Sequence, residues 1–212
     1  MDGVIIYAIV LLMKSVQTAE INCQVTSFKI QENFDLSKYL GTWYEIKWIA
    51  PFYHPEEDQW SDYQHTYRMK QDGGVAGYGS ARKPPAMECV YFRNDLNRTS
   101  ISGKFTFGEN GSPYWVIKTD YTNFATVYGC SKQYANGTCS NRRIWIWGRE
   151  TTLAEQFLKE AESAVTDVCV NTSVLVSTGH SEGCSVETNG SGSVLLSFSA
   201  MLLNYLILFV FK

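Results

Sequence analysis

Short stretches rich in β-branched and aromatic residues alternate with turn-forming residues along most of the chain. Turn signals such as Asp72-Gly73-Gly74 and Asn110-Gly111 separate them by loops short enough for hairpins. The pattern predicts eight β-strands, at residues 41–50, 60–70, 75–83, 87–93, 100–107, 113–119, 123–130 and 142–149. We therefore expect an all-β fold, an eight-stranded antiparallel up-and-down barrel whose interior holds one small ligand.

One α-helix is predicted after the last strand, from Thr152 to about Val165. Thr152-Leu153-Ala154-Glu155 has the Ser/Thr-x-x-Glu pattern of a capping box. Apolar residues recur on one helical face, at Leu153, Phe157, Ala161, Ala164 and Val168. This face would pack against the outside of the barrel, and residues 172–178 would form a ninth strand beside the first.

Both ends of the chain are apolar and lie outside the predicted barrel domain, residues 20–185. Residues 4–13 are apolar but too few to span a bilayer, and small and polar residues follow up to Ala19. This arrangement predicts a signal peptide at residues 1–19, cleaved after Ala19. A buried N-terminal strand is the alternative.

The C-terminal region has the composition of a glycosylphosphatidylinositol (GPI) attachment signal. A small, polar linker at 186–193 precedes a hydrophobic segment at 194–212, which would be removed and replaced by lipid. Asn189 is the expected attachment residue, with Ser185 as the alternative. A retained membrane span is the other interpretation of the segment.

Charge, sequons and cysteines are typical of an exported protein without nucleic-acid partners. The net charge is −3, and lysines and arginines are scattered along the strands. N-glycosylation is predicted at Asn97, Asn110, Asn136 and Asn171, and Asn189 also lies in a sequon. Six cysteines without zinc-binding spacing predict three disulfides and no metal site, although sequence alone allows about fifteen connectivities.

Three motifs would form the closed end of the barrel: Gly41-Thr42-Trp43-Tyr44-Glu45, Thr119-Asp120-Tyr121 and Arg149 at a strand end. An arginine stacked on the Trp43 ring would seal the floor through a cation–π contact. The three motifs, in this order, resemble the structurally shared regions of the lipocalin family. Residues 31–41 and 116–118 are similar to the branch of apolipoprotein D, bilin-binding and Lazarillo-like proteins, and the resemblance covers about residues 23–185.

Strand alternation assigns the barrel interior. If Arg149 points inward, Trp147, Trp145 and Arg143 do too, while Ile144 and Ile146 face the helix. The same alternation, with the alignment to the family, points Tyr67, Tyr114, Val116, Ala125, Val127 and His65 inward. We expect these side chains to line a cavity, the alternative being that the aromatic residues fill the barrel as core.

The cysteine pairing is an expectation from the resemblance and from element lengths. Cys23–Cys130 matches a disulfide of the apolipoprotein D branch. A descending strand and a returning helix would bring Cys169 to Cys139, which leaves Cys89 for Cys184. The chain departs from the family in having no cysteine between Cys23 and Cys89.

The resemblance implies a fatty acid, retinoid, steroid or bilin as ligand and no resident cofactor. The histidines His54, His65 and His180 belong to no catalytic motif, and paired cysteines leave no thiol for catalysis, so an enzyme is not expected. A haem carrier using His65 is an alternative, against the plainer interpretation of a rim histidine bonded to water.

Two roles remain open for such a barrel. The hydrophobic tail favours a GPI-anchored protein on the extracellular face of the plasma membrane. It would act in neuronal recognition or axon growth as Lazarillo-like proteins do, with a cell-surface protein partner and with residues 48–55 as contact surface. The alternative is a freely secreted carrier.

Overall fold

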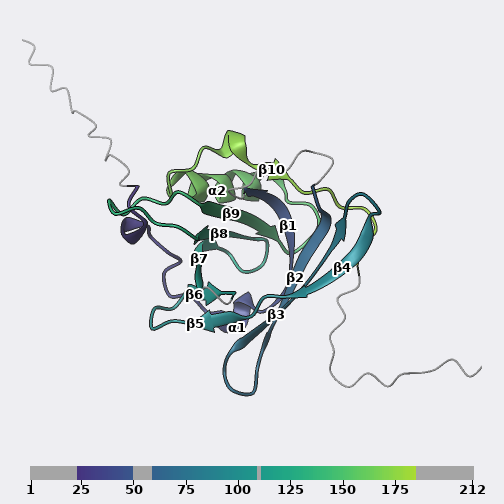
Figure 1. Cartoon of the computed structure of the whole chain (residues 1–212), viewed down its shortest axis with the longest axis horizontal. Coiled ribbons are helices and arrows are strands. Elements are labelled where there is room, and N and C mark those ends of the chain that lie inside the picture. Colours follow the sequence, from purple (N-terminus) through teal and green to yellow (C-terminus); the bar gives the residue numbers. More distant parts are fainter. Residues whose placement is uncertain (1–22, 50–58, 109–110, 185–212) are drawn as a thin grey trace, which may run out of the picture.

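The computed structural model describes residues 23–49, 59–108 and 111–184 (Figure 1). The signal peptide, Asn110, the attachment residues Asn189 and Ser185, the hydrophobic tail and most of the 48–55 loop lie outside the described residues.

The described strands form one antiparallel sheet that closes on itself (Figure 1). They are β1 Gly41–Ile49, β2 Ser61–Met69, β3 Val75–Lys83, β4 Glu88–Arg93, β5 Leu96–Arg98, β6 Lys104–Phe107, β7 Ser112–Thr119, β8 Phe124–Cys130, β9 Arg142–Gly148 and β10 Val176–Ser177. Neighbours in sequence pair with one another, and β1 pairs with β9 from Tyr44↔Gly148 to Ile49↔Ile144. β4 and β5 follow one another along β3, and β10 only adds to β1, so the barrel wall has the predicted eight positions.

The wall differs from the prediction around residues 94–103. The backbone N–H of Asn94 bonds to the Gly77 carbonyl, at 2.9 Å, where β4 ends, and the chain resumes pairing as β5, which was not predicted. The strand predicted from residue 100 begins only at Lys104, because a turn bonds Lys104 N–H to the Ile101 carbonyl. Gly103 in this turn has φ +82°, a conformation that favours glycine.

Helix α2, Glu155–Thr166, packs outside the barrel as expected. Its buried residues Ala161, Ala164 and Val165 join Ile144 and Ile146 in one hydrophobic cluster. The capping-box prediction is wrong: the helix starts after Ala154, which makes no side-chain capping bond. A short helix α1, Leu36–Tyr39, and the 3₁₀ turns η1, Val25–Ser27, and η3, Thr172–Val174, complete the described helices, none of which is long and apolar enough to cross a membrane.

The ninth strand is shorter than predicted, because η3 takes up its first half. β10 pairs with β1 through Lys47↔Ser177 and Trp48↔Val176. The following segment crosses to β2, where the Asp62 N–H bonds to the Gly179 carbonyl at 2.8 Å. It then reaches β4 through the disulfide Cys89–Cys184.

Three disulfides are present, and only the Cys89–Cys184 pairing agrees with the expectation. Cys130 pairs with Cys139 rather than Cys23, and Cys23 pairs with Cys169. The β8–β9 hairpin folds back tightly, with Gln133 bridged to Cys139, and so returns Cys139 to the end of β8. The N-terminal arm crosses this hairpin, since the Val25 N–H bonds to the Gly137 carbonyl, and Cys23 there meets the chain leaving α2.

Candidate binding cavity

The closed end of the barrel is built by the residues of the three motifs. The Arg149 guanidinium lies 3.6 Å from the centroid of the Trp43 ring. Gly41 has φ +98°, and a Cβ there would stand 3.3 Å from Arg149 Nη1. The Thr119 hydroxyl donates to the Phe124 carbonyl, at 2.6 Å, and the Tyr121 hydroxyl accepts from the Asp35 N–H, at 3.0 Å.

Asp120 closes the β7–β8 turn. Its Oδ1 accepts the backbone N–H groups of Thr122, Asn123 and Phe124, at 3.1, 2.8 and 3.0 Å. Bonds to the charged form favour that form, and together with the Asn123 amide they lower the pKa of this carboxyl against the opposing effect of its partial burial. The motif residues therefore join the segments at the closed end by hydrogen bonds, below the hydrophobic residues around Trp43.

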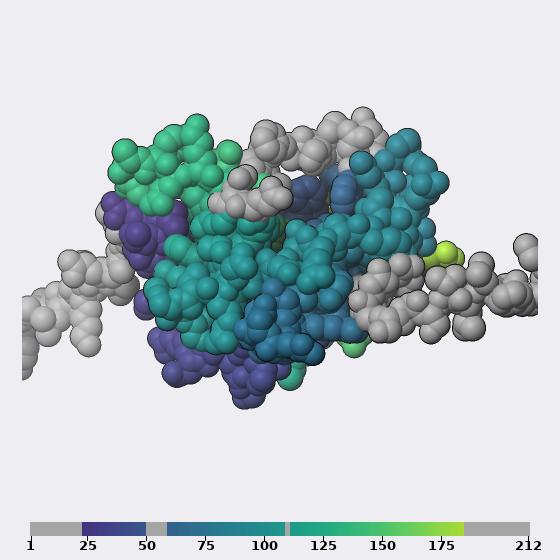
Figure 2. All heavy atoms as spheres, turned by 60° about the horizontal axis from the view of Figure 1, so that its bottom comes forward, coloured from purple at the N-terminus to yellow at the C-terminus, as the bar shows by residue number. Residues whose placement is uncertain are grey.

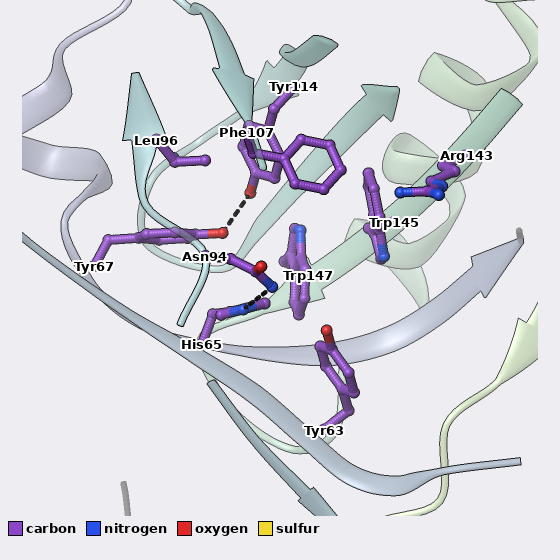
Figure 3. A pocket seen from close by; sticks show the side chains of 10 residues that line it. All are labelled: Tyr63, His65, Tyr67, Asn94, Leu96, Phe107, Tyr114, Arg143, Trp145 and Trp147. Atoms are coloured by element: carbon purple, nitrogen blue, oxygen red, sulfur yellow. Dashed lines mark hydrogen bonds between the residues drawn. The ribbon is translucent and has the colours of Figure 1, made fainter. Parts of the chain in front are cut away.

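Above this floor the barrel contains a cavity of about 250 Å³. Figure 2 shows the surface hollowed at the opposite end from the purple α1 region, between the green β8–β9 hairpin and the blue-teal β3–β4 hairpin. The side chains of ten residues line the cavity (Figure 3): Tyr63, His65, Tyr67, Asn94, Leu96, Phe107, Tyr114, Arg143, Trp145 and Trp147.

Six of these ten, including His65, were predicted to face the interior. Val116, Ala125 and Val127 face inward too, but they are fully buried in the cluster around Trp43 and do not line the cavity. Aromatic side chains thus fill the lower part of the barrel as core, and inward-facing side chains line a cavity in the upper part.

Four lining residues were missed. Tyr63 shares strand parity with His65, which would have identified it. Phe107 shares parity with the buried Phe105 on β6. Asn94 and Leu96 flank the break between β4 and β5, where alternation carries no signal.

Three tyrosine hydroxyls meet at the inner end of the cavity. The hydroxyls of Tyr39 and Tyr114 are 2.8 Å apart. The Tyr67 hydroxyl donates to Tyr114 at 3.2 Å (Figure 3). Burial raises the pKa of all three phenols, so they are uncharged at physiological pH. The Trp43 indole N–H donates to the Tyr39 carbonyl at 2.7 Å and ties this group to the floor.

His65 is buried and is not the water-bonded rim residue expected from sequence. Its exposed fraction is 4%, and its ring stacks on Tyr67 with centroids 5.6 Å apart. Burial lowers the pKa of His65 to about 3, so the imidazole is neutral. His65 Nε2 lies 3.3 Å from the Asn94 amide nitrogen (Figure 3). His65 Nδ1 and Trp147 Nε1 are buried with no hydrogen-bond partner among the described residues.

Charge is scarce around the cavity. Arg143 is the one lining residue of the ten that is charged at neutral pH, and its guanidinium lies 5.8 Å from the Phe107 ring centroid. Glu45, on β1 opposite Trp147, is buried and accepts the Thr178 hydroxyl at 2.7 Å. Burial raises the pKa of Glu45 to about 8. In the described part of the chain no three His, Cys, Asp or Glu residues are grouped as a metal site.

Comparison with known proteins agrees with this architecture. Apolipoprotein D of Cavia porcellus is 33% identical over 132 residues, which cover 60% of this chain and 67% of that protein. Apolipoprotein D of Oryctolagus cuniculus is 30% identical over 143 residues, covering 64% and 72%. Retinol-binding protein 4 of Gallus gallus is 25% identical over 166 residues, covering 72% and 83%.

Solved structures share the fold at lower identity. The cockroach allergen Per a 4 superposes with a TM-score of 0.60 at 19% identity, over 76% of this chain and 97% of that one. Apocrustacyanin C2 gives a TM-score of 0.57 at 19% identity, over 70% and 81%. Residues 40–182, more than half of the sequence, match one family as a whole. The chain therefore belongs to the lipocalin / cytosolic fatty-acid binding protein family.

Proposed function

We propose that this protein binds a small hydrophobic ligand inside the barrel. The observation that carries the proposal is the cavity itself, walled by Trp145, Trp147, Phe107 and Tyr114 above the Trp43 floor. Concave, mostly aromatic sites with a few polar groups are typical of small-molecule binding. The relatedness to retinol-binding protein 4 supports the same class of ligand.

The volume of the cavity narrows the class of ligand that it could hold. Its volume, about 250 Å³, lies slightly below the range usual for pockets that enclose drug-sized molecules. A slender molecule such as a fatty acid or a retinoid fits this space better than a bulky tetrapyrrole. The haem alternative gains no support, because His65 is stacked on Tyr67 and its Nε2 faces Asn94.

Tryptophan fluorescence tests the ligand proposal. A ligand in the cavity contacts Trp145 and Trp147, so adding a fatty acid or a retinoid changes the emission of the protein in a saturable way. Trp145→Ala weakens the binding. Trp115→Ala is the matched control, because Trp115 packs under Lys104 on the other side of the β7 wall and does not line the cavity. No saturable change with any probe contradicts the proposal.

We further propose that the protein acts on the extracellular face of the plasma membrane, held by a GPI anchor, in neuronal recognition or axon growth with a cell-surface protein partner. The composition of residues 186–212 and the resemblance to Lazarillo-like proteins support this location. Three disulfides support an oxidising compartment.

Phosphatidylinositol-specific phospholipase C tests the anchor. Animal cells expressing the full chain should release the protein into the medium on treatment, and mass analysis of the released C-terminus should find the glycolipid remnant on Asn189 or Ser185. A C-terminal peptide that retains residues 194–212 contradicts the anchor. Protein that is free in the medium without treatment favours the secreted carrier.

A further inference from the structure

Two buried polar atoms on the cavity wall have no hydrogen-bond partner among the residues described: His65 Nδ1 and Trp147 Nε1, here called the inner polar pair. The side chains are 4% and 1% exposed. Leaving a buried donor or acceptor without a partner is unfavourable, because the hydrogen bond to water that it loses on burial is not replaced. Most buried polar groups in folded proteins are paired, so two orphans on one cavity wall require an explanation.

We infer that the inner polar pair is a recognition site for the head group of the ligand, and that this head group is an uncharged oxygen, a hydroxyl or a carbonyl. The inference rests on the proposed function, since it assumes that the barrel binds a ligand. The ligand enters head first, and its apolar body lies against Trp145 and Phe107.

The positions of the two rings suit one ligand end. The ring centroids of His65 and Trp147 are 5.6 Å apart, and the rings meet edge to face at 72°. In Figure 3 the Trp147 nitrogen is at the end of the ring that points away from Tyr63, toward the space beside Trp145 and Tyr114. Both side chains line the same cavity.

The donor inventory sets the chemistry of the head group. The indole N–H only donates, so the ligand atom beside Trp147 accepts. If His65 Nε2 accepts from the Asn94 amide, then Nδ1 carries the proton of the neutral ring and also donates. A carbonyl oxygen satisfies both donors. A hydroxyl satisfies them too, and it also matches the other imidazole tautomer.

Charge at this position is disfavoured. Burial keeps His65 neutral, so it supplies no positive charge. The backbone of Arg143, the cation of the cavity, is four residues from Trp147 along β9, which is about 13 Å of strand, and its guanidinium lies 5.8 Å from the Phe107 ring centroid. A carboxylate bound at the inner polar pair would be buried without a counter-ion, at high cost. The cavity therefore discriminates between ligands of the same body by head group.

Two matched probe pairs test the discrimination: all-trans-retinol against all-trans-retinoate, and 1-dodecanol against dodecanoate. Each pair shares an apolar body and differs in the charge of the head group. We expect the alcohol of whichever body fits to bind at least on the order of tenfold more tightly than the acid at pH 7.4. Probe affinities are measured by fluorescence titration and by calorimetry.

Two variants assign the preference to the inner polar pair. Trp147→Phe removes the donor and keeps an aromatic ring, and His65→Phe removes both ring nitrogens. Each should weaken alcohol binding roughly five- to tenfold, the effect of about one hydrogen bond, and change acid binding less than twofold. Trp115→Phe, a tryptophan away from the cavity, is the matched control and should change neither.

The outcomes separate this inference from the proposed function. If no probe binds the wild-type protein, the proposed function fails. If probes bind but the acid equals the alcohol, or if both variants leave alcohol affinity within twofold of the wild type, the cavity is a hydrophobic site and the head-group inference is overturned.

Discussion

The guanidinium of Arg149 lies over the indole of Trp43, 3.6 Å from the ring centroid, and at the same time bonds to four backbone carbonyls. Its donors reach the carbonyl oxygens of Tyr121, Thr42, Lys38 and Tyr39 at 2.9, 2.8, 2.8 and 3.4 Å. These carbonyls belong to the β7–β8 turn, to β1 and to α1. One side chain therefore joins three separate segments beneath the barrel.

Replacing Arg149 should destabilise the barrel floor. Arg149→Ala removes the cation–π contact and leaves four carbonyls without this donor, so we expect a loss of roughly 3 kcal/mol in unfolding free energy. Arg149→Lys should lose less, since it keeps a cation but cannot reach four divergent carbonyls. Urea denaturation measures both variants against Arg98→Ala, an exposed arginine. Equal stability of Arg149→Ala and Arg98→Ala would contradict this role.

Glu45 should make the protein less stable as pH rises. Burial raises the pKa of this carboxyl from 4.5 to about 8 in the folded state. The folded protein thus keeps a proton that the unfolded chain gives up above pH 4.5. The associated stability is complete below pH 4.5 and is lost as pH rises through 8.

Glu45→Gln isolates this effect. Glutamine retains an oxygen that accepts the Thr178 hydroxyl and removes the titration. The variant should be more stable than the wild type by roughly 2–4 kcal/mol above pH 8 and equal to it near pH 4.5. Glu160→Gln, which removes a half-exposed partner of Lys118, is the control and should show no such gain. Parallel stability curves for Glu45→Gln and the wild type from pH 4.5 to 9 would refute the prediction.

His65 should make the protein less stable as pH falls, the opposite dependence from that of Glu45. Burial lowers the pKa of its imidazole from 6.5 to about 3. Below pH 6.5 the unfolded chain therefore binds a proton at His65 that the folded protein does not bind. Its contribution is present above pH 6.5 and is lost as pH falls toward 3. The NMR signals of the His65 ring in the native protein should not titrate between pH 8 and 4.5. A midpoint near 6.5 would show that the ring is solvated.

The closed end and the inward side of each strand could be predicted from sequence, because both depend on local order. Trp43 and Arg149 belong to short motifs. Alternation along β9 points Trp145 and Trp147 into the barrel, independently of the residues that surround them there. Alternation predicts which side of the barrel wall a side chain faces. It does not predict whether that side chain meets packed residues or the cavity at its level along the barrel axis. Val127 faces inward as predicted, yet it meets packed aromatic rings and not the cavity. The side chains that fill the lower barrel, Tyr39 and Phe34, come from outside the wall strands.

Two of the three cysteine pairs could not be deduced, because the four cysteines that form them lie at one end of the barrel. Strand and helix lengths correctly bring Cys139 and Cys169 to the same region, where both line one surface hollow with Cys23. Choosing among partners there depends on the path of a tight hairpin and of the N-terminal arm. Neither path has a periodic signal. The break between β4 and β5 was missed for the same reason.

The disulfide pairing itself is testable by peptide mapping without reduction. We expect linked peptides for Cys23–Cys169, Cys89–Cys184 and Cys130–Cys139. A peptide joining Cys23 to Cys130 would contradict the fold of the N-terminal arm. The pairs should also differ in their effect on stability, because they close loops of very different length.

The bond between Cys23 and Cys169 spans 146 residues, whereas that between Cys130 and Cys139 spans 9. In the chain-entropy model, replacing both cysteines of the long loop with alanine costs about 5 kcal/mol, and doing so for the short loop costs about 2.5 kcal/mol. Each double variant retains the other two disulfides, so the comparison isolates loop length. Equal losses in chemical denaturation would mean that the N-terminal arm stays docked in the unfolded ensemble, since the long crosslink would then remove little chain entropy.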